Sequence, residues 1–315
     1  MSVINEIVKS KTTAFSFELL PPLKGNGMGG VYKTIDALRE FNPKYINITT
    51  HRSEVVFRPL PNGLYEQQAE RHRPGTVAIA AAILNKYDIP VIPHVLCSGF
   101  TKEETEYVLI DLQYLGITDI LLLRGDKAKH EKAFVPTDHI HATDLQEQVN
   151  RFNQGFFIDG TPIKKPGTPF AYGMACYPEK HEEAPNLASD IHWAKAKVDA
   201  GASYLVTQMF FDNQKYVDFV AAVRNEGINV PIIPGLKPIT LLNQLTALPK
   251  IFHVDLPEAF SAELARCKTD AEAVEVGVEW CTQQAKELMQ LGVPSLHFYT
   301  MMATESVRRV ASEIY

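Results

Sequence analysis

The stretches FAYGMACYP (170–178), ASDIHWAKAKVDAG (188–201) and YLVTQMFFD (204–212) decide the fold class of this chain. The two outer segments are short and almost continuously apolar, as strands are when both faces of a sheet are buried. The middle segment repeats apolar residues at helical spacing and ends in Gly201, a residue type favoured directly after a helix. A strand, a helix and a second strand in this order predict a parallel βαβ unit.

The same alternation extends from this unit in both directions. The strand-like and helix-like segments pair as 14–20 with 31–41, 45–51 with 76–87, 90–97 with 101–116, 119–126 with 142–153, 170–178 with 188–201, 204–212 with 213–227, 231–237 with 240–248, and 295–301 with 304–315. Eight such units predict an α/β fold, a (β/α)8 TIM barrel. We expect residues 1–315 to form a single catalytic barrel domain without a regulatory domain. An open doubly wound sheet is the alternative, and it would need a reversal of strand order.

Two regions are longer than the minimal unit requires. Residues 154–169 contain Asp159-Gly160 between short apolar pieces, which predicts a hairpin-like insertion before strand five. Residues 253–291 continue the helical pattern and predict extra helices before strand eight. Thr101, with Glu104 three residues later, predicts a capping box at the start of a helix.

Composition excludes several classes of protein. The 31 Lys and Arg residues against 37 Asp and Glu residues give a net charge of −6, which disfavours a dedicated nucleic-acid binder. The four cysteines form no CxxC pair, which disfavours a disulfide framework or a structural zinc site and fits a reducing compartment. The N-terminus has no apolar signal core, and the longest apolar run, 77–84, is too short to span a bilayer. We expect a cytoplasmic protein with no membrane or nucleic-acid partner.

Polar residues gather at the predicted C-terminal ends of the strands, where TIM barrels place their chemistry. Glu18 is the most unusual, because it lies between the aromatic FSF and the aliphatic LLPP segments. Such surroundings raise the pKa of a carboxyl group, which suits a general acid near neutral pH. A buried salt bridge to a barrel lysine or arginine is the alternative interpretation.

Two further strand ends carry groups suited to a ligand. Arg124-Gly125-Asp126 combines a cation for phosphate or a flat ring with a glycine that allows close approach to the backbone. An ordinary turn with a capping aspartate would explain the same residues. Gln208 interrupts an apolar strand and offers a donor and an acceptor for a heteroaromatic edge, or else a hydrogen bond within the core.

Other polar residues also have plain structural explanations. Asp190 and Lys197 share one helix face, which a solvated ion pair would explain. His94 fits a hydrogen-bonded core histidine, and no Cys or carboxylate stands at metal-ligand spacing from His139 and His141, so we expect no metal site. Residues 25–30 match G-x-G-x-x-G, but Pro21-Pro22-Leu23-Lys24 precede them, so we interpret them as a loop.

The strand ends together resemble the catalytic barrel of bacterial-type methylenetetrahydrofolate reductases. The matching pieces run from about residue 15 to 301 and are FSFELLPP, PKYINIT, IPVIPHVLC, DILLLRGD, ATDL, CYPEKHEEA, DIHWAKAKVDAGASYLVTQMFFD, VPIIPGLKPI and HFYTM. The resemblance implies a flavoprotein of one-carbon metabolism and methionine biosynthesis, and a homo-oligomer. It would use NADH or NADPH to reduce FAD and, through FAD, 5,10-methylenetetrahydrofolate to 5-methyltetrahydrofolate.

The resemblance also implies roles for individual residues. Glu18 would be the general acid that protonates a folate nitrogen, and Asp126 would stabilise the cation that then develops. Gln208, with Tyr299, Glu18 and Asp126, would contact the folate. The positions implied for FAD contact are Thr49, His94, Arg124, Gly125, Asp126, Asp144, Tyr177, Asp190 and Lys197.

The chain departs from the family pattern after Thr49. The family commonly has a glycine-rich stretch there, whereas this chain has THRSE at 50–54. Two other functions stay open at this point. One is a pterin-binding barrel that transfers a methyl group without flavin, and the other is a non-catalytic flavin- or folate-binding subunit. Bound FAD would argue against the first of these.

Overall fold

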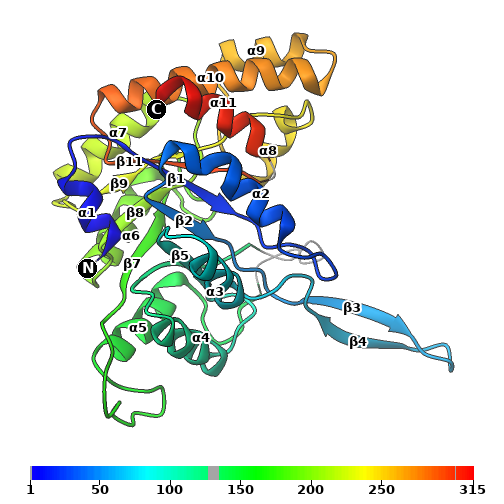
Figure 1. The fold of residues 1–315 in the computed structure, drawn as a ribbon, viewed down its shortest axis with the longest axis vertical. Helices are drawn as coiled ribbons and strands as arrows, with labels where there is room; N and C mark the ends of the chain where they lie inside the picture. The colour runs from blue at the N-terminus through cyan, green and yellow to red at the C-terminus, as the bar shows by residue number, and fades with distance from the viewer. Residues whose placement is uncertain (1, 127–134, 302) are drawn as a thin grey trace. The chain divides into compact units, whose positions relative to one another are not determined.

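Helices and strands alternate along the chain in the computed structural model, which describes residues 2–126, 135–301 and 303–315 (Figure 1). The helices are α1 (Val3–Lys9), α2 (Gly29–Leu38), α3 (Thr76–Lys86), α4 (Lys102–Tyr114), α5 (Ala142–Asn153), α6 (Leu187–Asp199), α7 (Asn213–Asn225), α8 (Gln244–Phe252), α9 (Glu258–Arg266), α10 (Asp270–Gln290) and α11 (Thr304–Ile314). The strands are β1 (Ala14–Leu19), β2 (Tyr45–Ile48), β3 (Glu54–Pro59), β4 (Tyr65–Glu70), β5 (Val91–Leu96), β6 (Asp119–Leu123), β7 (Ala171–Cys176), β8 (Tyr204–Thr207), β9 (Ile232–Ile233), β10 (Gly235–Leu236) and β11 (Ser295–Tyr299).

The strand order confirms the predicted fold class. One sheet has nine strands in the order β10-β11-β1-β2-β5-β6-β7-β8-β9. Only Pro234 separates β9 from β10, so the order begins and ends on the same stretch of chain, 232–236. Proline has no N–H to donate, which explains why the ladder is interrupted there. With these two pieces counted as one strand, the sheet has the eight strand positions of a TIM barrel.

The chain comprises two compact units. Unit 1 is Met1–Leu19, Tyr32–Asn47 and Tyr172–Tyr315, and unit 2 is Leu20–Val31 and Ile48–Ala171. In unit 1, β1 and β11 run parallel, with Phe17 opposite Phe298. The ring centroids of Phe15 and Phe298 are 5.6 Å apart. In unit 2, β5 and β6 run parallel, with His94 opposite Leu121.

The extra helices predicted between residues 253 and 291 are present in unit 1 as α9 and α10, which pack against each other (Figure 1). Phe260 of α9 stacks on Trp280 of α10 with ring centroids 4.5 Å apart. Gly277 allows α10 to approach the chain closely, because a Cβ there would lie 2.0 Å from the carbonyl oxygen of Ile239. These helices therefore complete an apolar cluster beyond the C-terminal end of β8.

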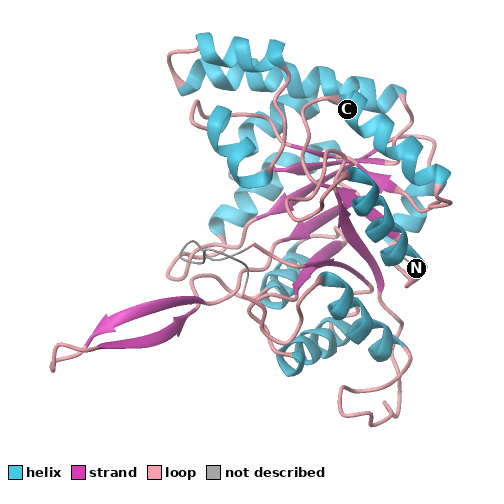
Figure 2. Ribbon diagram, turned by 180° about the vertical axis from the view of Figure 1, so that it is seen from behind, coloured by secondary structure: helices cyan, strands magenta, loops and turns pink. Residues whose placement is uncertain are grey.

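The sequence reading missed an antiparallel hairpin in unit 2, formed by β3 and β4. Both views show it extending as a two-stranded arm away from α3 and α4 of the same unit (Figure 2). Asn62-Gly63 lies at its turn, which is the strongest short hairpin signal in a sequence. Phe57, with 63% of its surface exposed, and Tyr65, with 69%, lie on this arm. Helix α1 was also not predicted.

The local signals predicted from sequence are largely confirmed. Thr101 and Glu104 form the capping box of α4. In the 154–169 insertion, a single antiparallel bridge joins Phe156 to Pro162, and the Thr161 amide donates to Asp159 at 2.8 Å, so the insertion is a hairpin-like turn without strands. No helix in the described parts of the chain has the length and apolar content needed to cross a bilayer.

Three of the four cysteines are buried, namely Cys97, Cys176 and Cys281. Burial raises the pKa of each of these thiols to about 12. Cys267 is partly exposed at the end of α9. All four are free thiols.

Candidate functional site

In unit 1, the candidate acid Glu18 belongs to a row of side chains on neighbouring strands. Glu18 lies opposite Tyr299 in the register of β1 and β11, and Ser16 lies opposite His297. Because alternate residues of a strand share a face, Ser16 and Glu18 point to the same side. Phe15 points to the other side, where its ring lies 5.8 Å from Phe41. Glu18 therefore points into the sheet interior, half-buried between two buried neighbours.

The residues two positions before Glu18 and Tyr299 on their strands, Ser16 and His297, are polar but buried. His297 is 1% exposed, and its Nδ1 lies 3.0 Å from the hydroxyl of Ser16. Burial lowers the pKa of His297 to about 3, so its ring is neutral at physiological pH. The ring of Tyr45 stacks parallel to it. This layer supports the strand ends above it without adding a charge.

Tyr299, predicted to contact substrate, is fixed by neighbouring strands. Its hydroxyl donates to the carbonyl oxygen of Thr207 at 2.6 Å. Its ring occupies the space beside Gly235, where a Cβ would lie 2.4 Å from a ring carbon. Burial and the nearby Glu18 raise its pKa well above the usual value, so it stays protonated. Tyr299 is held as a rigid wall beside Glu18.

Gln208 follows Thr207 directly at the end of β8. It is half-buried, and its side-chain oxygen accepts a hydrogen bond from the Met209 amide at 2.9 Å. Its own backbone amide donates to the carbonyl of Cys176 at 2.8 Å. The predicted folate contact therefore has its carboxamide oxygen engaged locally and its backbone tied to the end of β7.

Three residues predicted to contact FAD come together after β7 in unit 1. The Lys197 ammonium group donates to the carbonyl of Ala175 at 2.9 Å and lies 5.9 Å from the centroid of the Tyr177 ring. Asp190 is 8% exposed and accepts from the backbone amide of His181 at 2.8 Å. A solvated ion pair does not describe these residues, because Asp190 is buried and holds the loop that carries Tyr177.

In unit 2, backbone contacts join the strand ends. The hydroxyl of Thr50 donates to the carbonyl of His94 at 2.5 Å, which ties the chain after β2 to β5. The neighbouring Thr49 has its hydroxyl 3.1 Å from Nε2 of His51. His94 is 3% exposed and so belongs to the interior of the unit. Burial, with Arg73 nearby, lowers the pKa of His51.

The Arg124-Gly125-Asp126 turn is shaped around its glycine. Gly125 has φ +86°, and a Cβ there would lie 2.7 Å from the hydroxyl oxygen of Ser98. The Ser98 amide donates to the carbonyl of Arg124 at 2.9 Å. Arg124 is half-buried and Asp126 is exposed. The turn thus places a residue without a side chain between a cation and an anion.

Ser98 adds a polar atom to this turn. It is completely buried, and its hydroxyl has no hydrogen-bond partner among the described residues. Buried hydroxyls are usually hydrogen-bonded, so one without a partner needs an explanation of its own. A glycine turn with a half-buried cation beside it fits a flat cofactor with phosphates, such as FAD.

Asp144 has a structural task within unit 2. Its carboxylate accepts from the backbone amides of Ile140 at 2.8 Å and His141 at 2.9 Å at the start of α5. Burial pushes its pKa upward, but these two hydrogen bonds outweigh burial and the pKa is lowered. Asp144 is therefore an anion that caps a helix, whichever ligand it also meets.

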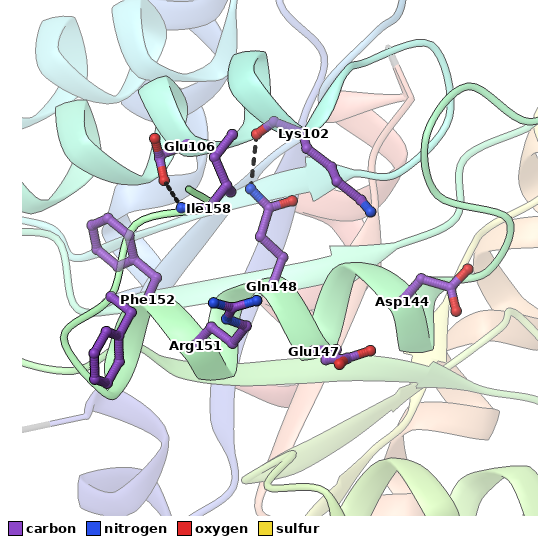
Figure 3. Close-up of a pocket in the computed structure, with 9 residues that line it drawn as sticks. Lys102, Glu106, Asp144, Glu147, Gln148, Arg151, Phe152 and Ile158 are labelled. Atoms are coloured by element: carbon purple, nitrogen blue, oxygen red, sulfur yellow. Dashed lines mark hydrogen bonds between the residues drawn. The ribbon is translucent and has the colours of Figure 1, made fainter. Parts of the chain in front are cut away.

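A surface pocket in unit 2 is lined by residues of α4, α5 and the 154–169 insertion (Figure 3). It has a volume of about 150 Å³ and is lined by Lys102, Glu106, Asp144, Glu147, Gln148, Arg151, Phe152, Phe156 and Ile158. Glu106 accepts from the Ile158 amide at 2.6 Å, and Gln148 donates to the Lys102 carbonyl at 2.8 Å. These bonds attach the 154–169 insertion to α4 and join α4 to α5. We assign the pocket to packing of the insertion rather than to chemistry.

Glu179 follows β7 and was not among the predicted site residues. Its Oε2 accepts from the Asp255 amide at 3.0 Å, and its Oε1 is buried without a partner among the described residues. Burial raises its pKa to about 7. The sequence shows a carboxylate after β7, in a YPE motif. The contact with the Asp255 loop is visible only in the folded structure.

The predicted site residues divide between the units. Glu18, Tyr177, Asp190, Lys197, Gln208 and Tyr299 belong to unit 1, and Thr49, His94, Arg124, Gly125, Asp126 and Asp144 belong to unit 2. Unit 1 brings Glu18 to Tyr299, and Tyr177 to Lys197. Unit 2 links the chain beside Thr49 to His94 through Thr50.

Comparisons with known proteins identify the family to which this chain belongs. The family described as methylenetetrahydrofolate reductase matches residues 3–314. The chain is 30% identical over 313 residues to methylenetetrahydrofolate reductase (NADH) 1 of Arabidopsis thaliana, covering 96% of this chain and 48% of that protein. It is 28% identical over 291 residues to 5,10-methylenetetrahydrofolate reductase of Salmonella typhimurium, covering 92% and 86%.

The chain thus spans about half the length of the Arabidopsis relative and most of the Salmonella one. Among solved structures, a Clostridium thermocellum protein that binds two copies of 5-methyl-5,6,7,8-tetrahydrofolic acid matches with a TM-score of 0.56. It is 13% identical, and the match covers 99% of both chains, so this likeness concerns the fold. The family match over residues 3–314 shows that this chain belongs to the methylenetetrahydrofolate reductase family.

Proposed function

We propose that this chain reduces 5,10-methylenetetrahydrofolate to 5-methyltetrahydrofolate, with NADH or NADPH as the source of electrons and FAD as the carrier. The observation that carries the proposal is Glu18, which points inward at a strand end beside a rigid tyrosine in a barrel of this family. The folate ligand named for the Clostridium thermocellum structure supports a folate as substrate.

Glu18 acts as the general acid. Its O–H bond breaks, and the proton goes to a folate nitrogen that bears the methylene bridge. The C–N bond to that nitrogen then opens, and the methylene carbon becomes part of an iminium cation. Arrival of a hydride at this carbon completes the methyl group.

Asp126 and Gln208 assist the substrate. A carboxylate beside the developing iminium stabilises its positive charge, which is the role proposed for Asp126. A carboxamide offers both a donor and an acceptor, so Gln208 is suited to the polar edge of a pterin. Tyr299 forms the wall against which the substrate lies next to Glu18.

FAD, when bound, supplies the hydride chemistry. The residues that would hold it are Thr49, His94, Arg124, Gly125, Asp126, Asp144, Tyr177, Asp190 and Lys197. Arg124 and Lys197 would provide the local positive charge that an anionic cofactor needs in a chain of net charge −6.

A visible spectrum of the purified protein, followed by anaerobic titration, tests the proposal. We expect flavin absorbance that NADH or NADPH bleaches and that 5,10-methylenetetrahydrofolate restores. Titrating NADH and NADPH separately identifies the preferred donor. A protein that neither contains FAD nor takes it up would refute the proposal and favour methyl transfer without flavin.

A further inference from the structure

Lys237 is a buried lysine at the same level of unit 1 as Glu18. It directly follows β10 and is 3% exposed. Leu236 lies opposite Phe298 on β11, so the next residue, Lys237, comes level with Tyr299. Tyr299 in turn lies opposite Glu18 on β1. Residues level with one another on adjacent parallel strands face the same side of a sheet, so these three side chains form one interior row.

A buried ammonium group is costly unless a neighbouring group compensates its charge. Among the residues that the structure describes, the charges that act on Lys237 are those of Glu18 from β1 and Cys281 from α10, and Tyr299 lies next to it on β11. Burial lowers the pKa of Lys237, whereas Glu18 and Cys281 raise it. Burial raises the pKa of the Cys281 thiol to about 12, so this thiol is neutral near pH 7. The carboxyl group of Glu18 is therefore the neighbour whose charge can balance the ammonium group.

Tyr299 does not compete for this task. Its hydroxyl hydrogen is committed to the Thr207 carbonyl at 2.6 Å. The hydroxyl of Thr300 is likewise committed, since it donates to the backbone carbonyl of Glu18 at 2.5 Å. These bonds fix the backbone and the wall around Glu18, and Lys237 is the cation on the same interior row.

We propose that Lys237 is a positioning residue for Glu18, whose ammonium group stabilises the carboxylate that forms when Glu18 gives up its proton. The inference rests on the proposed function, in which Glu18 is the acid. When the O–H bond of Glu18 breaks and an N–H bond forms on the folate, the negative charge left on Glu18 faces a cation already in place. A charge that is fixed before the reaction needs no reorganisation during it.

The test compares Lys237→Met, Lys237→Arg and Cys281→Ala in the full-length, FAD-loaded protein. The ionisation of Glu18 is followed by infrared difference spectra over a pH series, with Glu18→Gln identifying its carboxyl band. Removing an adjacent cation should move this titration upward by about one to three pH units in Lys237→Met. Lys237→Arg keeps the charge and should titrate close to the wild type, and Cys281→Ala should do the same.

Kinetics supply a second readout. The alkaline limb of the folate half-reaction should move with the Glu18 titration in Lys237→Met, while reduction by the nicotinamide keeps its rate. An unmoved Glu18 titration in a folded Lys237→Met protein would overturn the inference. Equal losses in both half-reactions with no change of pH profile would also overturn it, because they indicate a structural role. A wild-type protein that is never reoxidised by the folate instead refutes the proposed function, and the infrared titration distinguishes that case.

Discussion

The strand ends of unit 1 are characterised by their interior side chains, and those of unit 2 by contacts between backbone groups. In unit 1, interior side chains lie level on neighbouring strands, so Glu18, Tyr299 and Lys237 form a buried or half-buried row. In unit 2, the corresponding loops are tied by backbone groups, as where the Ser98 amide meets the Arg124 carbonyl. Gly125 there contributes no side chain at all.

The proposed acid Glu18 lies in unit 1, whereas the residues proposed to hold FAD come from both units. Proton transfer needs ionisable groups whose pKa values are controlled by burial and by neighbouring charges, and unit 1 provides such groups. In unit 2 the Gly125 turn needs a residue without a side chain, because a Cβ there would lie 2.7 Å from the Ser98 hydroxyl. The contrast can be tested by breaking each side separately.

Glu18→Gln breaks the unit 1 side and carries the largest expected effect. The amide cannot give up a proton, so the folate half-reaction should slow by about 10²- to 10⁴-fold. Reduction by NADH or NADPH needs no proton from Glu18 and should be retained. Stopped-flow absorbance of the flavin measures both half-reactions. An unchanged folate half-reaction in a protein that retains flavin would show that the acid role is wrongly assigned.

Gly125→Ala breaks the unit 2 side. The new Cβ would lie 2.7 Å from the Ser98 hydroxyl, on a backbone with φ +86°. A non-glycine residue in such a conformation costs of order 1–3 kcal/mol, and the contact adds to this cost. We expect weaker FAD binding and a lower Tm, measured by flavin fluorescence and thermal unfolding.

Gly116→Ala is the matched control for this variant. Gly116 has φ +75°, also lies in unit 2, and has open space where a Cβ would be. It should lose stability through backbone strain alone and keep its affinity for FAD. Equal loss of FAD affinity in both variants would indicate a general effect of strain and not a binding role for the Gly125 turn.

Glu179→Gln tests whether burial in unit 1 raises the pKa of a carboxyl group enough to make stability depend on pH. Burial raises the pKa of Glu179 from an ordinary 4.5 to about 7, so the folded state binds more protons than the unfolded state between these values. The stability from this group is present below the unfolded pKa and is lost as the pH rises through about 7. The Tm of Glu179→Gln relative to wild type should therefore increase from pH 5 to pH 8.

The exposed Glu226 provides a control for the Glu179 measurement. Glu226→Gln changes charge by the same amount at the surface of unit 1. A difference in Tm that grows equally with pH in both variants would contradict the assigned burial effect at Glu179.

Phe57→Ser with Tyr65→Ser should have the smallest effect. These residues of the β3–β4 arm are 63% and 69% exposed, and exposed substitutions usually change stability by less than about 0.5 kcal/mol. Phe152→Ala, at a residue 5% exposed in the same unit, should cost about 3–5 kcal/mol. Urea unfolding compares the two. A large loss in the arm variant would show that the arm is packed in solution.

The strand–helix alternation made most of the barrel predictable from sequence, because buried parallel strands leave long apolar runs. The β3–β4 arm escaped because its strands are exposed and so lack such runs, although Asn62-Gly63 signalled the turn. Polar residues at strand ends also predicted the candidate site residues, whose roles stay a prediction. What each side chain contacts could not be predicted, since Asp144 caps a helix and Glu179 meets a loop about 76 positions later.

The buried thiols have a consequence for measuring motion in this protein. An alkylating reagent attacks thiolates, and Cys97, Cys176 and Cys281 are both covered and kept protonated near pH 7. Each therefore reacts only when its surroundings open. Cys97 reports on unit 2, and Cys176 and Cys281 report on unit 1. When the partly exposed Cys267 is replaced by serine, the alkylation rates of the three buried thiols measure how often each unit opens locally.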